Sequence, residues 1–420
     1  MLIPNYDRVY PGLLEALEGG AFVARARSAP ALFYNPAGIA LSDRTVLNAS
    51  AQGYQLTTIS GSGFQQSSGG VFETLPSFLG VVLGKEVIDW ESVRLGFAVV
   101  HPIHSSLTAI ASTTPAEGQR ASYSVNSSFD TLTPTFSVGW AVAPSFRLGG
   151  SIEFPYTSLS NTGKLSGEIT TATTSRATLR TLAVTGSTLK VRGTVGLQWD
   201  PLGWLKLGVL VRSPGLNIKS GGSFQYEALT TFTTGTRQVF FQDSGVDFQY
   251  KLPLEAGLGA AFEFGPVGVE IDLRWHDGTD AYNLYSSTKM GRVVDTSTGT
   301  PAISDFAFPG VAYRARQIWN GSVGAHVALS QNFIISAGSY LDYSPVDPAV
   351  GHAFRQLNVW GVRAGVSFRI DKLAASVGGG WERGTGTDNL FPPAGLPVPE
   401  ETADLTLNTF TLLFSVSFRF

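Results

Sequence analysis

The last twelve residues, Thr409 to Phe420, constrain the fold more than any other stretch of the chain. One parity of this segment is apolar and rich in aromatic rings: Phe410, Leu412, Phe414, Val416, Phe418 and Phe420. The other parity is polar except for Leu413. Successive side chains of a strand point to opposite faces, so the segment predicts a strand with one apolar and one polar wall. A core strand of a soluble sheet alternates in the same way, but a soluble protein rarely leaves so apolar a strand at a free end.

Composition favours strands that face lipid on one side. Charged residues make up only 15 % of the 420 residues, against roughly 25 % in ordinary soluble proteins. No apolar run reaches the length of about 18 residues that a transmembrane helix needs. The chain has no cysteine, which excludes disulfides, thiol catalysis and cysteine metal sites. A net charge of −3 without a basic block argues against nucleic acid as a partner.

The alternation pattern predicts fourteen strands, most of them long enough to cross a bilayer when tilted. They cover residues 44–54, 71–84, 92–101, 129–143, 145–157, 189–199, 203–213, 247–264, 266–277, 314–329, 332–343, 357–370, 373–384 and 405–420. Strand 266–277 is typical: Val267, Ile271 and Leu273 lie on one face, and Glu270 and Arg274 on the other. Charges on a lipid-facing wall are unfavourable, so we expect the charged face to line the bore. Glycines on the inner wall leave room for something that fills it.

The predicted connections alternate in length along the chain. Long ones are 55–70, 102–128, 158–188, 214–246, 278–313, 344–356 and 385–404; short ones include 200–202, Gly265 and 371–372. An even number of strands with long loops at one rim and tight turns at the other is typical of bacterial outer-membrane barrels. We therefore predict an all-β, fourteen-stranded antiparallel transmembrane barrel over residues 44–420, with the long loops outside the cell.

Residues 1–43 do not have the pattern of barrel strands. Leu13, Leu14 and Leu17 suggest a short helix, and the segment is too apolar to lie free in the periplasm. We predict that it folds into the bore as a plug, or hatch; the alternative is a disordered leader.

The sequence resembles the FadL family of outer-membrane transporters for hydrophobic molecules, which includes the toluene channels such as TodX. The resemblance rests on Asn35-Pro36-Ala37 before the first strand, on residues 338–349 (GSYLDYSPVDPA) and on residues 252–259 (LPLEAGLG). Their order and their position relative to the strands extend it over essentially the whole chain. It implies a hatch and passive uptake of long-chain fatty acids or aromatic and aliphatic hydrocarbons. It also implies lateral exit into the bilayer beside an inward kink in the third strand.

Two features of this chain are candidates for that route. Proline cannot donate a hydrogen bond to a sheet, so His101-Pro102 at the end of the third predicted strand is a candidate kink. Pro102 could equally begin the loop. The aromatic side chains of connection 214–246 are candidates for substrate capture, unless they only pack the loop: Phe224, Tyr226, Phe232, Phe240 and Phe241.

The sequence gives no sign of catalysis or of a cofactor. It has no Gly-x-Ser-x-Gly, His-Glu-x-x-His or P-loop motif. His101 and His104 are close together, but a metal site needs further ligands that the sequence does not place, so we predict no metal. We likewise predict that the protein has no catalytic residues and no cofactor.

The expected protein is thus a monomeric, non-enzymatic channel of the bacterial outer membrane, inserted by the barrel assembly machinery, with hydrophobic small molecules, lipid or detergent as its partners. The first residues, MLIPNYDRVYPG, do not form a signal peptide, so we expect that one was removed or that the start is displaced. Two alternatives remain at this point: a barrel enzyme acting on lipids, and a general polar porin. The pattern of residues does not identify the hydrophobic substrate.

Overall fold

The protein is a closed antiparallel β-barrel. The computed structural model describes residues 4–7, 9–61, 67–71, 75–113, 119–170, 175–347, 349–350, 356–389 and 402–420. Fourteen strands pair in a ring within this part of the chain. They are β1 (Val46–Gly61), β3 (Leu75–Leu83), β4 (Val93–Thr113), β5 (Gln119–Ala143), β6 (Phe146–Glu153), β8 (Ser175–Leu202), β9 (Leu205–Arg212), β12 (Glu255–Phe264), β13 (Val267–His276), β18 (Ile318–Ser330), β19 (Phe333–Asp342), β20 (Gln356–Ile370), β21 (Leu373–Asn389) and β22 (Thr402–Arg419).

The C-terminal strand closes the ring against the first strand. β22 pairs with β1 from Val46↔Arg419 to Gly61↔Leu405, and with β21 on its other side. The aromatic side chains of β22 face outward, as its alternation predicts, with Phe410 and Phe414 about half exposed. Closure pairs both sides of the terminal strand, which removes the exposed edge that an open sheet would leave.

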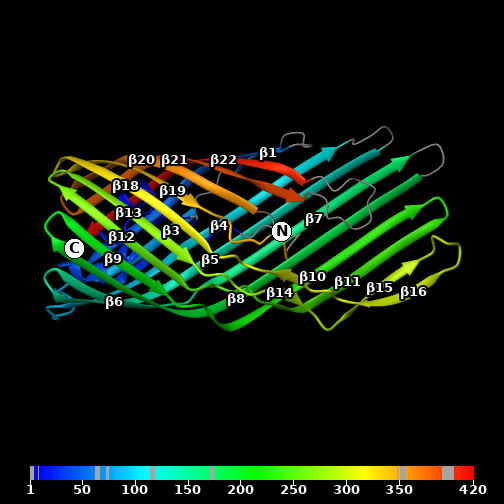
Figure 1. Cartoon of the computed structure of the whole chain (residues 1–420), viewed down its shortest axis with the longest axis horizontal. Coiled ribbons are helices and arrows are strands. Elements are labelled where there is room, and N and C mark those ends of the chain that lie inside the picture. Colours follow the sequence, from blue (N-terminus) through cyan, green and yellow to red (C-terminus); the bar gives the residue numbers. More distant parts are fainter. Residues whose placement is uncertain are drawn as a thin grey trace.

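The prediction of long loops was wrong for several connections, because hydrogen-bonded hairpins replace them. Additional strands extend the wall at one end of the barrel: β2 (Ser67–Val71), β7 (Tyr156–Thr170), β10 (Leu216–Phe232), β11 (Gly235–Phe248), β14 (Tyr282–Ser286), β15 (Met290–Asp295), β16 (Ala302–Ala307) and β17 (Val311–Tyr313). Segments 158–188 and 214–246 are rich in Thr, Ser and β-branched residues, which pair well in sheets. The short turns lie at the other end, where the C-terminus is (Figure 1). One of them falls at 203–204 rather than 200–202, since β8 runs on to Leu202.

The outer face carries two bands of exposed aromatic rings. Trp140, Trp199 and Phe418 lie towards the short-turn end of their strands. Trp319 and Phe410 lie farther from that end of theirs. Exposed aliphatic side chains, such as Leu412 and Val416 on β22, lie between the bands. An apolar band with aromatic girdles at both borders is the pattern of barrels that sit in a bilayer. No helix in the described residues has the length and apolar character needed to span a membrane.

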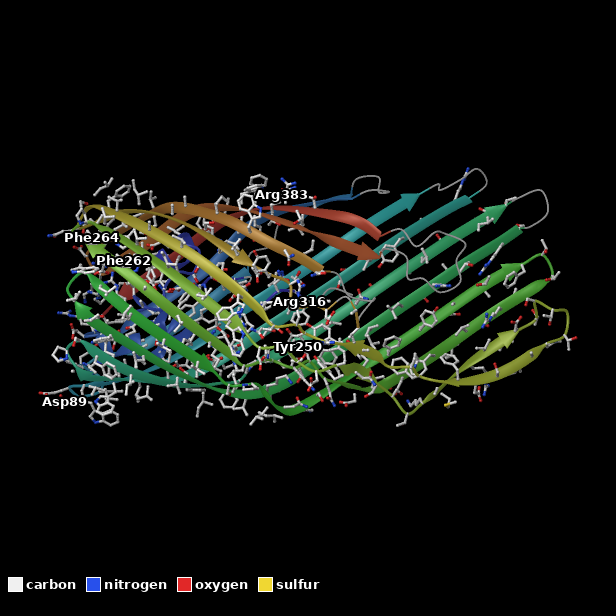
Figure 2. All side chains as sticks on the ribbon, in the orientation of Figure 1. Asp89, Tyr250, Phe262, Phe264, Arg316 and Arg383 are labelled. Carbon is white, nitrogen blue, oxygen red and sulfur yellow. The ribbon has the colours of Figure 1, made fainter. Side chains whose placement is uncertain are left out.

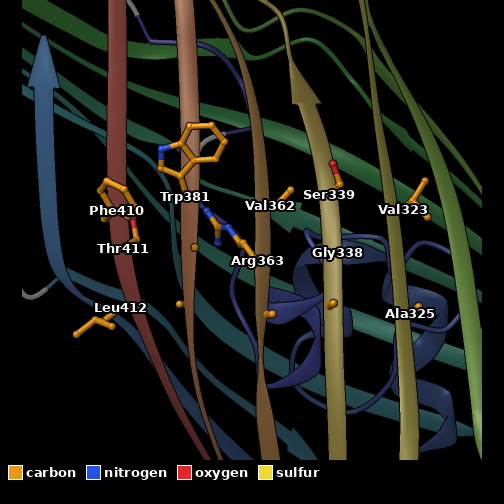
Figure 3. A pocket seen from close by; sticks show the side chains of 14 residues that line it. Val323, Ala325, Gly338, Ser339, Val362, Arg363, Trp381, Phe410, Thr411 and Leu412 are labelled. Atoms are coloured by element: carbon orange, nitrogen blue, oxygen red, sulfur yellow. The ribbon is translucent and has the colours of Figure 1, made fainter.

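A recess of about 880 Å³ lies on this outer face, over β18 to β22. Small outward-facing side chains form its floor in one cross-strand row, Ala325, Ala337, Ala364 and Gly379. Trp381 and Phe410 stand at its border (Figure 3). Because it faces away from the bore, lipid tails would fill this recess.

The N-terminal segment, residues 9–42, fills the bore at the short-turn end. It contains two single-turn helices, α1 (Leu14–Leu17) and α2 (Ala31–Tyr34), and the 3₁₀ helix η1 (Pro36–Leu41). Most of its residues are buried, and its coil is visible through the wall behind β19 and β20 (Figure 3).

Inward-facing glycines allow this close packing. A Cβ atom on Gly149 would lie 2.2 Å from the Ala37 nitrogen, and one on Gly338 would lie 2.2 Å from the Glu18 carbonyl carbon. The expectation that inner-wall glycines make room for material in the bore is confirmed.

Gly149 and its neighbour Gly150 provide a matched test. A side chain on Gly149 collides with η1, whereas the closest atom to a Cβ on Gly150 is 3.7 Å away, on the neighbouring strand. We expect Gly149→Val to displace the N-terminal segment and expose Arg25 to trypsin in the folded, detergent-solubilised barrel, and Gly150→Val to leave Arg25 protected. Mass spectrometry of the fragments measures the difference. Equal protection in both variants would contradict the packing.

Candidate functional site

Asn35 fastens η1 to the barrel wall. Its side chain is fully buried and accepts a hydrogen bond from the Ala37 amide at 3.2 Å, which caps η1. Its amide nitrogen donates to the carbonyls of Val23 (2.8 Å), Leu197 (3.0 Å) and Val209 (3.3 Å). Leu197 and Val209 are directly paired residues of β8 and β9. The Asn35 side chain thus joins Val23 and Ala37 of the segment to strands β8 and β9 of the wall.

The other two residues of the predicted motif have structural positions beside it. Pro36 is the first residue of η1, where its missing N–H is not needed. Ala37 is buried against Gly149 of β6. The three predicted motif residues therefore lie together at the contact between segment and wall.

The charged face of β13 binds the same segment. Glu270 accepts from the Arg25 guanidinium (2.7 Å) and the Ala24 amide (2.6 Å), and Asp272 accepts from the Phe22 amide (2.7 Å). Arg25 also pairs with Glu18 at 2.6 Å. The inward orientation predicted for this face is confirmed. The backbone amides of Phe22 and Ala24 donate hydrogen bonds to its carboxylates.

A second cluster ties Asp7, just before the N-terminal segment, to β13 and β18. The Asp7 carboxylate accepts from Arg274 at 2.9 Å and from Asn320 at 2.8 Å, and lies 3.2 Å from His276. All four side chains are buried. Asp7 and Arg25 carry no motif, so sequence reasoning missed them; the unpaired charged face of β13 was the signal for such partners.

The barrel wall is interrupted between β3 and β4. In the described residues, their pairing runs from Leu83↔Leu95 to Phe78↔Val100 and stops there, although both strands continue. β4 shifts register against β5 between Val100 and Ile103, which makes a bulge at His101-Pro102. β3 also carries a register shift against β1, next to Pro76. Prolines and bulges remove ladder hydrogen bonds, and here one of each lies on both strands beside the point where their pairing ends.

The N-terminal segment lies along the inner side of this interruption. The Val9 amide donates to the Pro102 carbonyl at 3.2 Å, and the Gly12 amide donates to Ser50 Oγ of β1 at 3.2 Å. The residue of the segment that bonds the kink is Val9, whereas Ala37 of the Asn-Pro-Ala motif lies against Gly149 of β6.

His101 and His104 meet a third polar side chain on the outer face. His104 Nδ1 lies 2.6 Å from Asp130 Oδ1, and His101 Nε2 lies 3.2 Å from the same oxygen. The sequence did not place a third ligand beside the two histidines, and cross-strand pairing of His104 with Asp130 supplies it.

An aromatic cluster occupies the bore beyond the N-terminal segment. Its buried members, which come from β4, β5, β11, β14, β17 and the loop after β11, include Ile103, Phe129, Phe241, Phe248, Tyr250, Leu284, Tyr285 and Tyr313. Tyr250 lies near the middle of the molecule, well away from Phe262 and Phe264 at the short-turn end (Figure 2). The hydroxyls of Tyr250 and Tyr285 are buried and have no hydrogen-bond partner among the described residues. The cluster therefore offers apolar surface with a few polar points.

The five predicted capture residues divide between this cluster and the outer hairpin. Phe224 and Phe241 are buried in it, and both pack on Phe308, with ring centroids at 4.8 and 4.6 Å; Tyr226 packs at its margin. Phe240 is 39 % exposed, and Phe232 lies at the hairpin tip against Arg176. Segment 214–246 is the β10–β11 hairpin and not an irregular loop, and its strands point alternate residues to opposite faces.

The bulge lies where the two apolar clusters meet. Val100 packs with the N-terminal segment, in a cluster that includes Leu32, Tyr34 and Phe78. Ile103, three residues later, packs in the aromatic cluster. The interruption in the wall is therefore adjacent to both the segment and the aromatic cluster.

Removal of Asn35 tests the fastening of the segment. Asn35→Ala leaves three carbonyls without this donor, and an unsatisfied buried group costs about 1–3 kcal/mol. We expect Asn35→Ala to lower the free energy of unfolding in urea by about that amount. Asn48 is the matched control, since it is a buried asparagine whose side-chain amide has no partner in the part of the chain that the structure describes. Asn48→Ala should change stability little; an equal loss in both would contradict the role of Asn35.

Glu15 gives a pH test of the same segment. Burial in α1 raises the pKa of its carboxyl to about 7. Because the pKa is higher in the folded state, the stability it contributes is complete below about pH 4.5 and is lost as pH rises through about 7. We expect the thermal midpoint of the wild type to fall over this window relative to Glu15→Gln. Parallel pH profiles of the two proteins would contradict the shift.

Solved structures with a similar architecture include transporters. No protein-family model matches the sequence, and no curated protein matches it. A Pseudomonas aeruginosa FadL homologue superimposes with a TM-score of 0.63 at 13 % identity, with 99 % of each chain covered. The Pseudomonas putida toluene transporter TodX gives 0.62 at 15 % identity and 98 % coverage of each chain, and the Ralstonia pickettii toluene transporter TbuX gives 0.55 at 13 % and 99 %. The chain therefore has the fold of the FadL and TodX barrels over its whole length.

Proposed function

We propose that this protein is a passive channel of the bacterial outer membrane for hydrophobic compounds, either long-chain fatty acids or aromatic and aliphatic hydrocarbons. The observation that carries the proposal is the interruption between β3 and β4 beside two apolar clusters in the bore. The names of the similar structures, a FadL homologue and toluene transporters, agree with it.

The outer surface supports the membrane location. Exposed aliphatic residues between two aromatic bands suit the hydrocarbon region of a bilayer and its interfaces. A closed ring of strands pairs its backbone groups within the wall, as lipid requires.

The aromatic cluster is the proposed path for substrate through the outer half of the bore. Apolar surface removed from water stabilises a bound molecule by roughly 25 cal/mol per Å². A fatty acid or hydrocarbon would enter between aromatic rings such as Phe224 and Phe308, which lie below the exposed hairpins. The unpaired hydroxyls of Tyr250 and Tyr285 could receive a carboxyl group.

Residues 1–43 are the proposed hatch, with residues 44–420 as the barrel. The buried segment leaves little room for water-filled passage, which favours this role over a general polar porin. Substrate would leave sideways between β3 and β4, because an apolar molecule gains nothing by entering the aqueous periplasm. Val9 bonds β4 at the gap and Gly12 bonds β1, the strand that pairs with β3 on its other side, so this stretch is placed to control the gap.

The uptake experiment uses a bacterial strain that cannot take up fatty acids on its own, with the chain behind a secretion signal. We expect uptake of radiolabelled oleate or toluene above that of the empty vector, with low conductance for salt in planar bilayers. Asn35→Ala and Pro36→Ala should reduce uptake while the barrel stays folded. Porin-like conductance without uptake of either probe would contradict the proposal.

A disulfide tests the lateral route. Val9 bonds the carbonyl of the Pro102–Ile103 peptide, so Val9→Cys and Ile103→Cys place two thiols on adjacent backbone segments in a chain without other cysteines. We expect oxidation to stop uptake and reduction to restore it, with each single-cysteine variant as a control. Undiminished uptake through the oxidised protein would exclude this route.

A further inference from the structure

We propose that His101, His104 and Asp130 bind a divalent transition-metal ion of the zinc class on the outer face of the barrel, at the bulge in β4. Their three ligand atoms lie within 4.8 Å of one another. The proposal concerns ion binding and does not depend on the uptake function.

The bulge is what brings the two histidines to one face. Residues three apart in a regular strand point to opposite sides. The register shift between Val100 and Ile103 inserts an extra residue, so His101 and His104 both reach the outer face. Ile103 between them faces the bore and is buried in the aromatic cluster.

β5 supplies the third ligand from directly opposite. Asp130 is the cross-strand partner of His104, and its neighbours Phe129 and Thr131 face inward and are buried. The carboxylate therefore points outward, where Oδ1 lies 2.6 Å from His104 Nδ1 and 3.2 Å from His101 Nε2.

These separations are close to those of a metal centre. Zinc binds imidazole nitrogen and carboxylate oxygen at about 2.0–2.2 Å in a tetrahedron, so its ligand atoms lie about 3.3 Å apart. Small rotations of the two imidazole rings would convert the present hydrogen bonds to coordination. Three protein ligands would leave one position for water.

The site is accessible to ions from water. Leu132, the next outward residue of β5 towards the short turns, is 43 % exposed in the apolar band and pairs with Tyr156. Ser128 and Asn126 are the next positions in the other direction. Asp130 thus lies where the outer face changes from apolar to polar, and its side chain is 34 % exposed.

The donor set selects the class of ion. Imidazole suits zinc, copper and nickel, whereas calcium and magnesium take oxygen ligands. Two imidazoles and one carboxylate therefore favour the transition metals over the calcium and magnesium that accompany lipid phosphates in an outer membrane.

Cobalt and zinc titrations of the purified full-length protein test the site. The protein carries no polyhistidine tag, is held in detergent and is stripped with a chelator. We expect one Co²⁺ per chain with visible absorption typical of low coordination number, displaced by Zn²⁺ and not by Ca²⁺. Calorimetry with Zn²⁺ measures the affinity.

The variants decide whether these residues are the ligands. His101→Ala, His104→Ala and Asp130→Asn should each weaken Zn²⁺ binding at least about tenfold, as loss of one metal ligand does. Asp305→Asn is the control, because Asp305 is an exposed aspartate paired with Arg292 on the β15–β16 hairpin. Heat-dependent mobility on gels verifies that each barrel is folded. Absence of binding to the wild type, displacement by Ca²⁺, or unchanged binding in the folded variants would overturn the proposal.

Discussion

The pairing of backbone groups around the ring is the constraint on which the rest of this structure depends. In lipid, an unpaired backbone amide or carbonyl cannot form a hydrogen bond with water. The strands of the wall therefore pair with their neighbours wherever their geometry allows. β22 closes on β1 for this reason, and its outward rings follow from the same register. The interruption between β3 and β4 departs from the rule, and the N-terminal segment supplies a donor, the Val9 amide, to a carbonyl beside it. The segment is thus part of how the wall is completed.

The buried charges of β13 explain why the N-terminal segment stays in place. Breaking a buried pair such as Arg25–Glu270 costs about 3–5 kcal/mol, because it leaves an uncompensated charge. Asp272 and Glu270 also accept amides of the segment, so withdrawal of residues 22–25 as a unit would leave several groups unsatisfied at once. Val9 and Gly12 have single hydrogen bonds to the wall by comparison. The buried Asp7–Arg274 pair holds the chain two residues before Val9 in the same way.

Alternation along the strands was enough to predict the barrel, since a face such as Glu270, Asp272 and Arg274 has no place in lipid. The Asn-Pro-Ala motif was found for a similar reason, because a buried amide and a proline mark a fixed bend. The outer hairpins were not predicted, because segments rich in serine and threonine without an apolar face were assigned to loops. In the structure, β7, β8 and β10 pair along these segments. Contacts between distant segments, such as His104 with Asp130 and Asp7 with Arg274, depend on strand register, which one sequence does not fix.

The unequal strand lengths give the barrel a mouth that faces sideways. β8 has 28 residues and β5 has 25, whereas β13 and β19 have 10 each. At about 3.3 Å per residue, β8 alone is roughly 90 Å long, several times the thickness of the apolar band of a barrel. The excess stands on one side of the opening as a tall screen, while the opposite rim is low (Figure 1). With this end outside the cell, as the proposed channel function requires, a molecule that travels along the cell surface would meet this screen broadside and be turned towards the bore.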